Sequence, residues 1–216
     1  MLGERYRAAA ENLLGALGDR CGVPEVSLER AEERLGLRLP LALREYYLAL
    51  GALAELNRAH NRLLGPGKWF LDAGKLVFLV ENQAVVYWGV EATEQPEGDP
   101  PVFQGVNRQP EPIEWYPEHE RCSEFLLVML HWQAVTGGLE FLGTADVGVE
   151  VVRHFEQHWK RVGELEGLLA FSREGQAACF VGEGDARQLY AGCRSEEALE
   201  RIASELEALV AGLNYL

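Results

Sequence analysis

The chain has 216 residues, of which 48% are hydrophobic and 25% charged, as in ordinary globular proteins. Its 34 acidic and 20 basic residues give a formal net charge of −14, which argues against a nucleic acid or an anionic membrane as partner. No apolar run approaches the roughly 20 residues that a membrane span needs.

Helical patterns fill the first 64 residues. A first helix contains residues 11–17, and a second has Ser27 as its N-cap and Gly36 as its C-cap. A third helix begins after Pro40, because proline favours the first position of a helix. A fourth is expected over residues 53–64.

From residue 69 the hydrophobic period changes from 3.6 to 2, and short aromatic or β-branched runs predict a meander of antiparallel strands over 69–116. The segment VENQAVVYWGV is expected to be one strand. Its alternation places Asn82 and Trp88 on the core face, and Glu81, Gln83 and Tyr87 on the other face. Asn82 is therefore expected to be a buried structural residue whose amide binds neighbouring backbone.

Helix returns over residues 123–138, with Ser123 as its N-cap. Residues 147–163 begin as strand and end as helix, residues 167–185 form a hairpin that turns at Glu174–Gly175, and Ser195 caps a final amphipathic helix. The expected fold class is α+β, with an antiparallel sheet of about five to six strands flanked by N-terminal, central and C-terminal helices.

The N-terminal 20 residues mix charged with apolar residues, unlike a signal peptide, so a cytoplasmic location is expected. The four cysteines are widely spaced and form no C-x-x-C pair, which predicts reduced, packed thiols and neither disulfides nor a zinc site. They are Cys21, Cys122, Cys179 and Cys193.

Motifs for catalysis are weak throughout. His154 and His158 have the i, i+4 spacing of metal ligands, but no third ligand is suggested by spacing. FVGEGDAR lacks the third glycine of a dinucleotide loop, and GPGK (65–68) lacks the Gly-Lys-Ser/Thr ending of a phosphate loop. No catalytic residue, metal site or cofactor is predicted, although a metal-dependent hydrolase using the two histidines stays open as an alternative.

The negative charge is uneven along the chain. Residues 1–70 hold nine acidic and ten basic residues, residues 71–125 hold 11 and three, and residues 126–216 hold 14 and seven. Acidity of this kind can simply keep a protein soluble. It can also form an acidic face for a basic partner, and an exposed aromatic beside carboxylates is typical of an interaction surface.

Four blocks in this order resemble the SUKH superfamily, which includes yeast cell-wall-assembly regulators and bacterial immunity proteins. The blocks are ERAEERLGLRLPLALREYYLALG (29–51), VFLVENQAVVYWGV (77–90), DPPVFQG (99–105) and CSEFLLVML (122–130). The resemblance implies one domain over residues 1–216, with a core over about 25–160 and a hairpin-plus-helix extension over 161–216. The positions taken as its structural motif are Gly36, Leu39, Pro40, Tyr46, Asn82, Trp88 and Pro100.

The resemblance also implies a non-enzymatic protein that binds and neutralises a toxin such as a nuclease or another enzyme, as a monomer or weak homodimer. The alternative within the same fold is a regulator or scaffold with a cellular partner. Together with the acidic segment, this predicts a partner-binding surface formed by Glu81, Gln83, Tyr87, Glu91, Glu94, Asp99, Glu114, Trp115 and Glu118.

Overall fold

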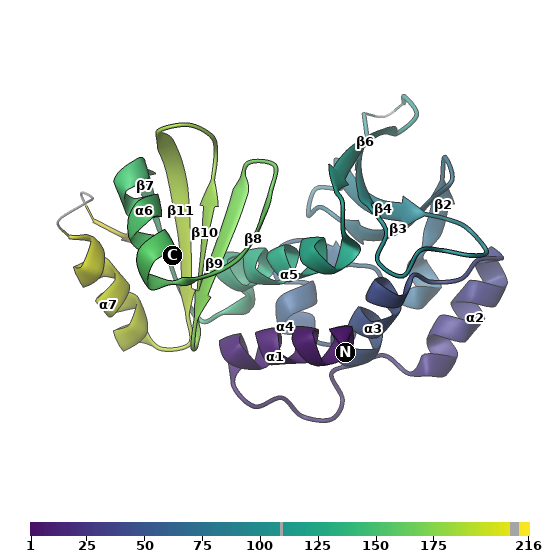
Figure 1. The fold of residues 1–216 in the computed structure, drawn as a ribbon, viewed down its shortest axis with the longest axis horizontal. Helices are drawn as coiled ribbons and strands as arrows, with labels where there is room; N and C mark the ends of the chain where they lie inside the picture. Colours follow the sequence, from purple (N-terminus) through teal and green to yellow (C-terminus); the bar gives the residue numbers. More distant parts are fainter. Residues whose placement is uncertain (109, 208–211) are drawn as a thin grey trace. The chain divides into compact units, whose positions relative to one another are not determined.

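The computed structural model describes residues 1–108, 110–207 and 212–216. The chain forms two compact units, one made of residues 1–7 and 18–126 and the other of residues 8–17 and 127–216. Each unit contains one antiparallel sheet of six strands (Figure 1). The α+β class is therefore confirmed, while the second sheet was not expected.

The helices of the first 57 residues follow local signals. Gly36 has a left-handed φ of 65° and ends α2, as predicted, and Pro40 and Gly51 flank α3. Ser27 is not the N-cap of α2, because the helix begins two residues earlier, after Pro24. The helix expected over 53–64 is reduced to one turn, since residues 62–63 pair with a strand. The helices are α1 (Leu2–Leu14), α2 (Glu25–Leu35), α3 (Leu41–Leu50) and α4 (Ala54–Asn57).

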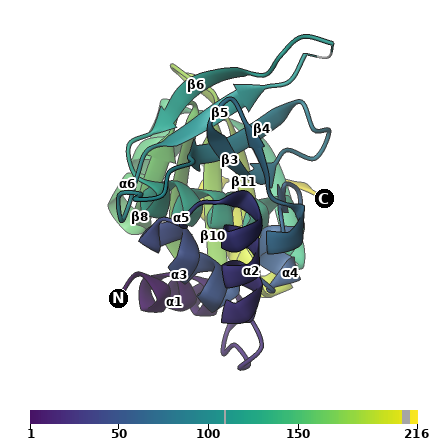
Figure 2. The same cartoon turned by 90° about the vertical axis from the view of Figure 1, so that its right-hand side faces the viewer.

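The first sheet is the predicted meander. Its order is β1-β3-β4-β5-β6, with β2 paired to β3, and all pairs are antiparallel. Figure 2 shows α2, α3 and α4 together on one side of its strands. The strands are β1 (Arg62–Leu63), β2 (Phe70–Asp72), β3 (Lys75–Val80), β4 (Val86–Glu91), β5 (Val102–Val106) and β6 (Glu114–His119), and a short 3-10 turn, η1 (Pro66–Lys68), precedes β2.

The single strand predicted over 80–90 is wrong, because residues 81–85 form the turn between β3 and β4. Ala84 has a φ of 60° in this turn, and one Glu81 carboxylate oxygen accepts hydrogen bonds from the backbone N–H groups of Gln83 and Val85. Asn82 is exposed at the tip, with its Nδ2 atom 3.3 Å from a His60 ring nitrogen. The buried structural role expected for Asn82 is therefore wrong.

Buried aromatic rings and a few polar groups hold the first unit together. The Tyr47 hydroxyl donates to the Leu64 carbonyl at 2.6 Å and accepts from Trp69 Nε1 at 2.9 Å. The Tyr46 hydroxyl donates to Asn57 Oδ1 at 2.8 Å, and the Asn57 amide donates to the Leu50 carbonyl. These bonds satisfy polar groups that would otherwise be costly to bury.

The other motif positions have structural roles within the first unit. The backbone N–H of Leu39 donates to the buried Glu32 carboxylate at 2.7 Å. Trp88 is 7% exposed, and its ring lies 6.1 Å from that of Phe125. The carbonyl of Pro100 accepts from the Cys122 backbone N–H at 2.8 Å.

The second unit contains a six-stranded sheet of order β12-β7-β11-β10-β9-β8. The predicted hairpin at Glu174–Gly175 is confirmed between β9 and β10. Residue 161 lies inside β8, so the extension expected from that point does not begin at a boundary of the structure. The strands are β7 (Phe141–Gly148), β8 (Lys160–Leu165), β9 (Leu168–Arg173), β10 (Gln176–Val181), β11 (Ala186–Cys193) and β12 (Asn214–Tyr215).

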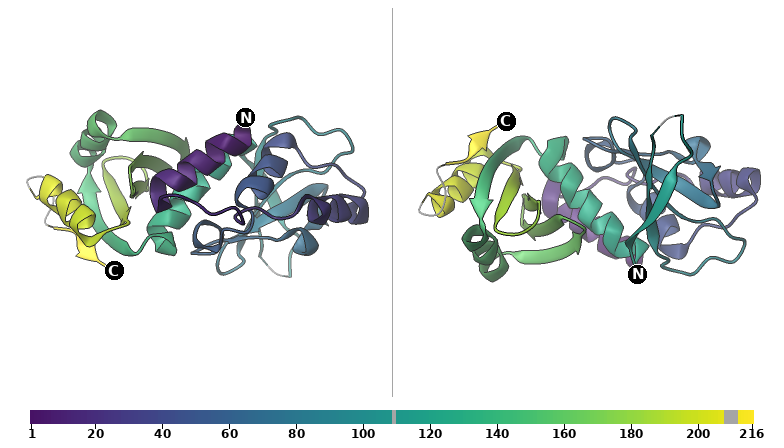
Figure 3. Two further views of the ribbon diagram at one scale, coloured as in Figure 1. Left: turned by 90° about the horizontal axis from the view of Figure 1, so that it is seen from below. Right: turned by 90° about the horizontal axis from the view of Figure 1, so that it is seen from above.

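Helices cover one face of this second sheet. Figure 3 shows α6 (Val149–His158) and α7 (Glu196–Leu206) on the same face, where Phe155 and Ile202 join its hydrophobic core. Ser195 caps α7 as predicted, accepting from the Ala198 N–H. The predicted continuation of this helix to residue 213 falls partly on residues 208–211, outside the described residues.

The central helical segment consists of α5 (Cys122–Gln133) and a π-helical turn, η2 (Ala134–Gly138). Residues 125–131 are all buried, which explains the apolar character of this helix on every side.

All four cysteines are buried and free, as predicted. Among the described residues, every helix is too short or too polar to span a bilayer.

His131 makes the stability of the fold sensitive to acid. Its ring is buried, Nδ1 lies 2.8 Å from the Leu127 carbonyl, and burial lowers the pKa of His131 from 6.5 to about 4. The unfolded chain then binds a proton at a higher pH than the folded protein. The stability that this neutral ring contributes is complete above about pH 6.5 and decreases as the pH falls toward 4.

We expect His131→Gln to remove about 2 kcal/mol of the stability loss that the wild type shows between pH 7.5 and 5. The measurement is urea unfolding at both pH values. Gln157→Asn, at an exposed position of α6, removes no titratable group, so it is the control and should keep the wild-type pH dependence. An equal pH dependence in wild type and His131→Gln would contradict the assignment.

Candidate functional site

The face of the first sheet that points away from the Trp88 core carries a row of aromatic and glycine residues. Tyr87 in β4 lies opposite Gly105 in β5, which lies opposite Trp115 in β6. In the neighbouring row Gly89 pairs with Phe103. We call this surface the outer face, and define it by Phe70, Asp72, Lys75, Tyr87, Gly89, Glu91, Phe103, Gly105 and Trp115.

The Trp115 indole lies directly over the two glycines. An added Cβ at Gly105 would lie 2.9 Å from Trp115 Cζ3, and one at Gly89 would lie 3.3 Å from Trp115 Cη2. Gly105 must therefore lack a side chain for the ring to lie against the strands, while Gly89 is constrained chiefly by the Leu76 carbonyl oxygen, 2.9 Å from its added Cβ. An aromatic ring over a strand glycine also protects the backbone that the missing side chain leaves open.

Trp115 Nε1 donates a hydrogen bond to Asp72 Oδ2 at 2.8 Å. Because β3, β4 and β5 separate β2 from β6, a flat sheet with strands about 4.8 Å apart would put Asp72 and Trp115 roughly 19 Å apart, beyond the reach of their side chains. The sheet must therefore curl toward its outer face, which makes this face concave.

Other contacts also reach over a strand on the outer face. The Phe70 and Tyr87 rings meet edge to face with their centroids 5.9 Å apart. Lys75 Nζ lies 4.4 Å from the centre of the Phe103 ring and 2.8 Å from Glu91 Oε1. Tyr87, Phe103 and Trp115 are half-buried and Phe70 is exposed, so aromatic surface remains accessible.

The charge of this part of the chain is not balanced internally. Residues 71–125 contain three basic and 11 acidic residues. Each basic residue already has a carboxylate from the same segment, at 2.8, 3.9 and 3.7 Å, so a negative excess remains. The pairs are Lys75–Glu91, Arg108–Glu114 and Arg121–Glu124.

The residues predicted to bind a partner do not all share one surface. The outer face brings together Tyr87, Glu91 and Trp115. Glu81 and Gln83 lie at the tip of the β3–β4 hairpin, where the carboxylate of Glu81 binds the turn. The remaining four residues lie elsewhere in the unit: Glu94 and Asp99 between β4 and β5, and Glu114 and Glu118 on β6.

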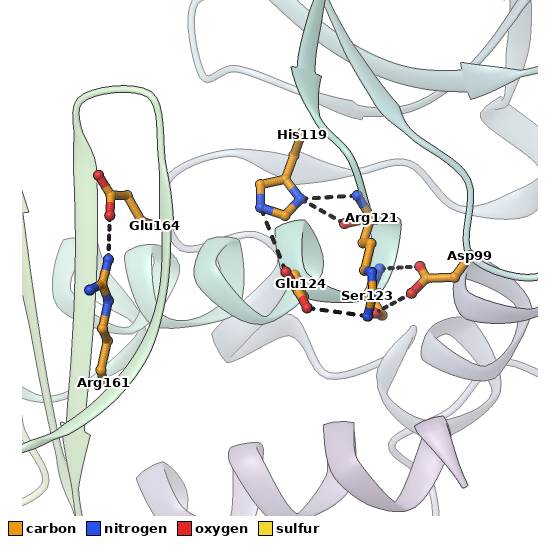
Figure 4. A network of polar contacts seen from close by, with 7 residues as sticks. All are labelled: Asp99, His119, Arg121, Ser123, Glu124, Arg161 and Glu164. Atoms are coloured by element: carbon orange, nitrogen blue, oxygen red, sulfur yellow. Dashed lines mark hydrogen bonds and ion pairs between the residues drawn. The ribbon is translucent and has the colours of Figure 1, made fainter.

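Asp99 binds the start of α5. Its two carboxylate oxygens accept from the Ser123 backbone N–H at 2.7 Å and from the Ser123 hydroxyl at 2.6 Å (Figure 4). The sequence predicted Ser123 as the N-cap, but the helix begins at Cys122, so Ser123 lies inside it and its backbone N–H is met by a carboxylate from a distant loop.

Asp, Ser and His side chains occur together here without forming a catalytic triad. In such a triad the serine hydroxyl donates to the histidine, whereas Ser123 donates to Asp99 and is buried. His119 instead accepts from the Arg121 backbone N–H at 3.1 Å and lies 3.9 Å from Glu124 (Figure 4). Figure 4 also draws Arg161 and Glu164, an ion pair on β8 of the second unit.

Other candidates for chemistry are inert in this geometry. The His154 and His158 rings stack with centroids 4.4 Å apart, and His154 Nε2 lies 3.5 Å from Glu205. The described residues contain no group of three or more His, Cys, Asp or Glu side chains placed to hold a metal. Burial raises the pKa of the Cys193 thiol to about 12 and that of Cys122 above its ordinary value, so neither is a ready thiolate.

Several residues of the outer face were not predicted from the sequence: Phe70, Asp72, Lys75, Gly89, Phe103 and Gly105. The signal that could have found them is a glycine inside each of two predicted strands, Gly89 in β4 and Gly105 in β5. A glycine inside a strand often marks a close approach of another group. Which aromatic ring lies over a glycine depends on how β4, β5 and β6 are aligned, and this strand register is not encoded in the local sequence.

No protein-family model, curated protein or solved structure matches this chain. The resemblance to the SUKH superfamily therefore depends on the sequence motifs alone and stays a prediction.

The Asp99 cap can be tested by its effect on stability. We expect Asp99→Ala to lower the free energy of unfolding by about 1–2 kcal/mol, because two donors at the start of α5 lose their acceptor. Glu97→Gln, two residues away and exposed, is the control and should change stability by less than about 0.5 kcal/mol. Urea unfolding of both variants measures the difference, and equal stabilities would show that the cap contributes nothing.

The packing of Trp115 gives a second test. Gly105→Ala places a methyl group 2.7 Å from Ile113 Cγ2 and 2.9 Å from the indole. We expect a loss of about 1–3 kcal/mol of stability and a shift of the Trp115 indole N–H resonance in NMR spectra as its bond to Asp72 lengthens. Gly98→Ala, where an added Cβ comes no closer than 4.0 Å to Leu41, should change neither quantity. An unchanged indole resonance in Gly105→Ala would contradict the close packing.

Proposed function

We propose that this chain is a non-enzymatic binding protein of the immunity type, which neutralises a protein toxin by associating with it through the outer face of the first sheet. The observation that carries the proposal is the combination of accessible aromatic rings on a concave sheet face with a negative excess in the same segment. The motif resemblance supplies the kind of partner.

The chemistry of the outer face suits a basic protein partner. Phe70, Tyr87 and Trp115 offer rigid rings of the kind that anchor interfaces, because they bury a large area at low entropic cost. The excess carboxylates of residues 71–125 would accelerate encounter with a positive surface. A nuclease toxin fits this description, because its cleft must attract phosphates and would equally attract carboxylates.

The location, oligomeric state and cofactor of the proposed protein are those expected from the sequence. The protein would act in the cytoplasm as a monomer or weak homodimer, without a cofactor. A regulator or scaffold of the same fold would use the same face for a cellular partner. The two functions differ in one outcome, which is whether the protein protects cells from a toxin.

Co-expression with the product of the neighbouring gene tests the proposal. We expect a stable one-to-one complex after purification of a tagged chain, and restored growth of cells in which that product alone is toxic. A complex without protection would favour the regulator or scaffold. Absence of both binding and protection would count against the immunity function.

Neutralising exposed carboxylates should slow association with this partner. We expect Glu91→Gln, Glu94→Gln and Glu114→Gln together to lower the association rate constant at least tenfold at low salt and to weaken its salt dependence, with little change in dissociation. Stopped-flow mixing at several salt concentrations measures both quantities.

The matched control carries the same charge change on the second unit. Glu156→Gln, Glu166→Gln and Glu183→Gln replace three exposed carboxylates outside the first sheet. This control should associate nearly as fast as the wild type. Equal slowing in the two triple variants would show that only the net charge matters and that the carboxylates of the first unit do not steer the partner.

A further inference from the structure

A pocket of about 630 Å³ lies in the first unit between α2 and residues 58–68. Its lining includes five basic side chains and no acidic one: Arg30, Arg34, Arg58, Arg62 and Lys68. A quarter of the 20 basic residues of a strongly acidic chain are thus gathered around one cavity. We call it the basic pocket.

The charges of the basic pocket are not neutralised by the protein. None of the five cations lies within 4.0 Å of a carboxylate among the described residues, whereas the three basic residues of 71–125 are all paired. Like charges that line one cavity repel one another, and this repulsion destabilises the protein when the pocket is empty. A bound anion would relieve the repulsion.

Helix α2 separates its charges by face. Ser27, Arg30 and Arg34 follow the spacing of one helix face and line the basic pocket. Glu29 and Glu33 line a different cavity, beside Glu94. The acidic residues next to the arginines in sequence therefore do not line the basic pocket.

The walls of the basic pocket are fixed in place. The Arg34 guanidinium donates to the carbonyls of Pro66 and Trp69, each at 3.1 Å, which ties α2 to the turn η1. Ala31, Leu63 and Pro66 also line the pocket and are buried, so part of its lining is apolar. A pre-formed cavity with a partly apolar lining and converging polar groups is the usual form of a small-molecule site.

We propose that the basic pocket binds a small organic phosphate that carries two or more phosphate groups. Its volume is that of a metabolite site, and guanidinium groups bind phosphate oxygens through paired N–H donors. Two or more anionic groups are needed to match five cations. No aromatic side chain lines the pocket to stack on a base, so the phosphates carry the recognition.

The net charge of −14 does not prevent this binding. At physiological ionic strength charges farther than about 8 Å are largely screened, so an anion in the pocket responds mainly to the five cations. The site also differs from a phosphate loop, because GPGK contributes Lys68 without the glycine-lysine-serine sequence. The basic pocket is a different surface from the outer face, so phosphate binding there does not depend on the proposed toxin binding.

Calorimetric titration of the whole purified chain tests the proposal, with tripolyphosphate and ATP as probes, both free of divalent cations. We expect saturable one-to-one binding that weakens from 50 to 200 mM salt. Binding of both probes with similar affinity means that the phosphates are recognised alone, while tighter ATP binding means that the nucleoside also contributes.

The variant Arg30→Gln with Arg62→Gln should bind tripolyphosphate at least tenfold more weakly. Both residues are exposed and neither is bonded to the protein in the way that Arg34 is, so the fold should be kept, and thermal unfolding checks this. Arg20→Gln with Arg153→Gln has the same charge change at exposed positions outside the pocket and should bind as the wild type does.

Three results would overturn the proposal. They are no saturable binding of either probe, an equal loss in the two double variants, or binding of a single-stranded oligonucleotide without binding of tripolyphosphate. The last result would indicate an extended polyanion on the surface and not a small phosphate in the cavity.

Discussion

The contact of the Trp115 indole with Gly89 and Gly105 determines the form of the first sheet and of its outer face. The indole can reach Asp72 across three strands only if the sheet curls, and it lies against β5 only because Gly105 has no Cβ. A side chain at Gly105 would come within 2.9 Å of the ring and displace it, whereas one at Gly89 would first meet the Leu76 carbonyl oxygen, also at 2.9 Å. The aromatic surface therefore depends on two residues that contribute no surface themselves.

Acidic and basic residues gather on different surfaces of the first unit. What each surface can bind depends on this local distribution more than on the net charge of the whole chain. Basic residues of 71–125 are each matched by a carboxylate, whereas those around the basic pocket are not. The same helix, α2, presents arginines to one cavity and glutamates to another. A net charge of −14 describes neither surface, because exposed charges act over about one Debye length.

Residues 80–90 differ most from the structure that their sequence pattern predicts. Their alternation is that of a strand, and no glycine or proline marks a turn within the first five of them. The turn is stabilised by a Glu81 carboxylate oxygen and by a left-handed Ala84, and neither feature is visible in local propensity. Asn82 consequently lies exposed at a tip, and the residues after it keep the predicted alternation, with Trp88 buried and Tyr87 half-buried.

The sequence by itself determined most helices, the strands of the first meander, the α+β class, the C-cap at Gly36, the N-cap at Ser195 and the turn at Glu174–Gly175, because these depend on neighbouring residues. It missed β11 and expected helix at the end of 147–163, where the structure has β8. The tertiary structure alone decided the second sheet, the Asp99 cap on α5, the curled outer face and the basic pocket. Each of these joins residues that are far apart in the chain, 24 positions for Asp99 and Ser123 and 43 for Asp72 and Trp115. Such contacts follow from strand register and packing, which no local pattern encodes.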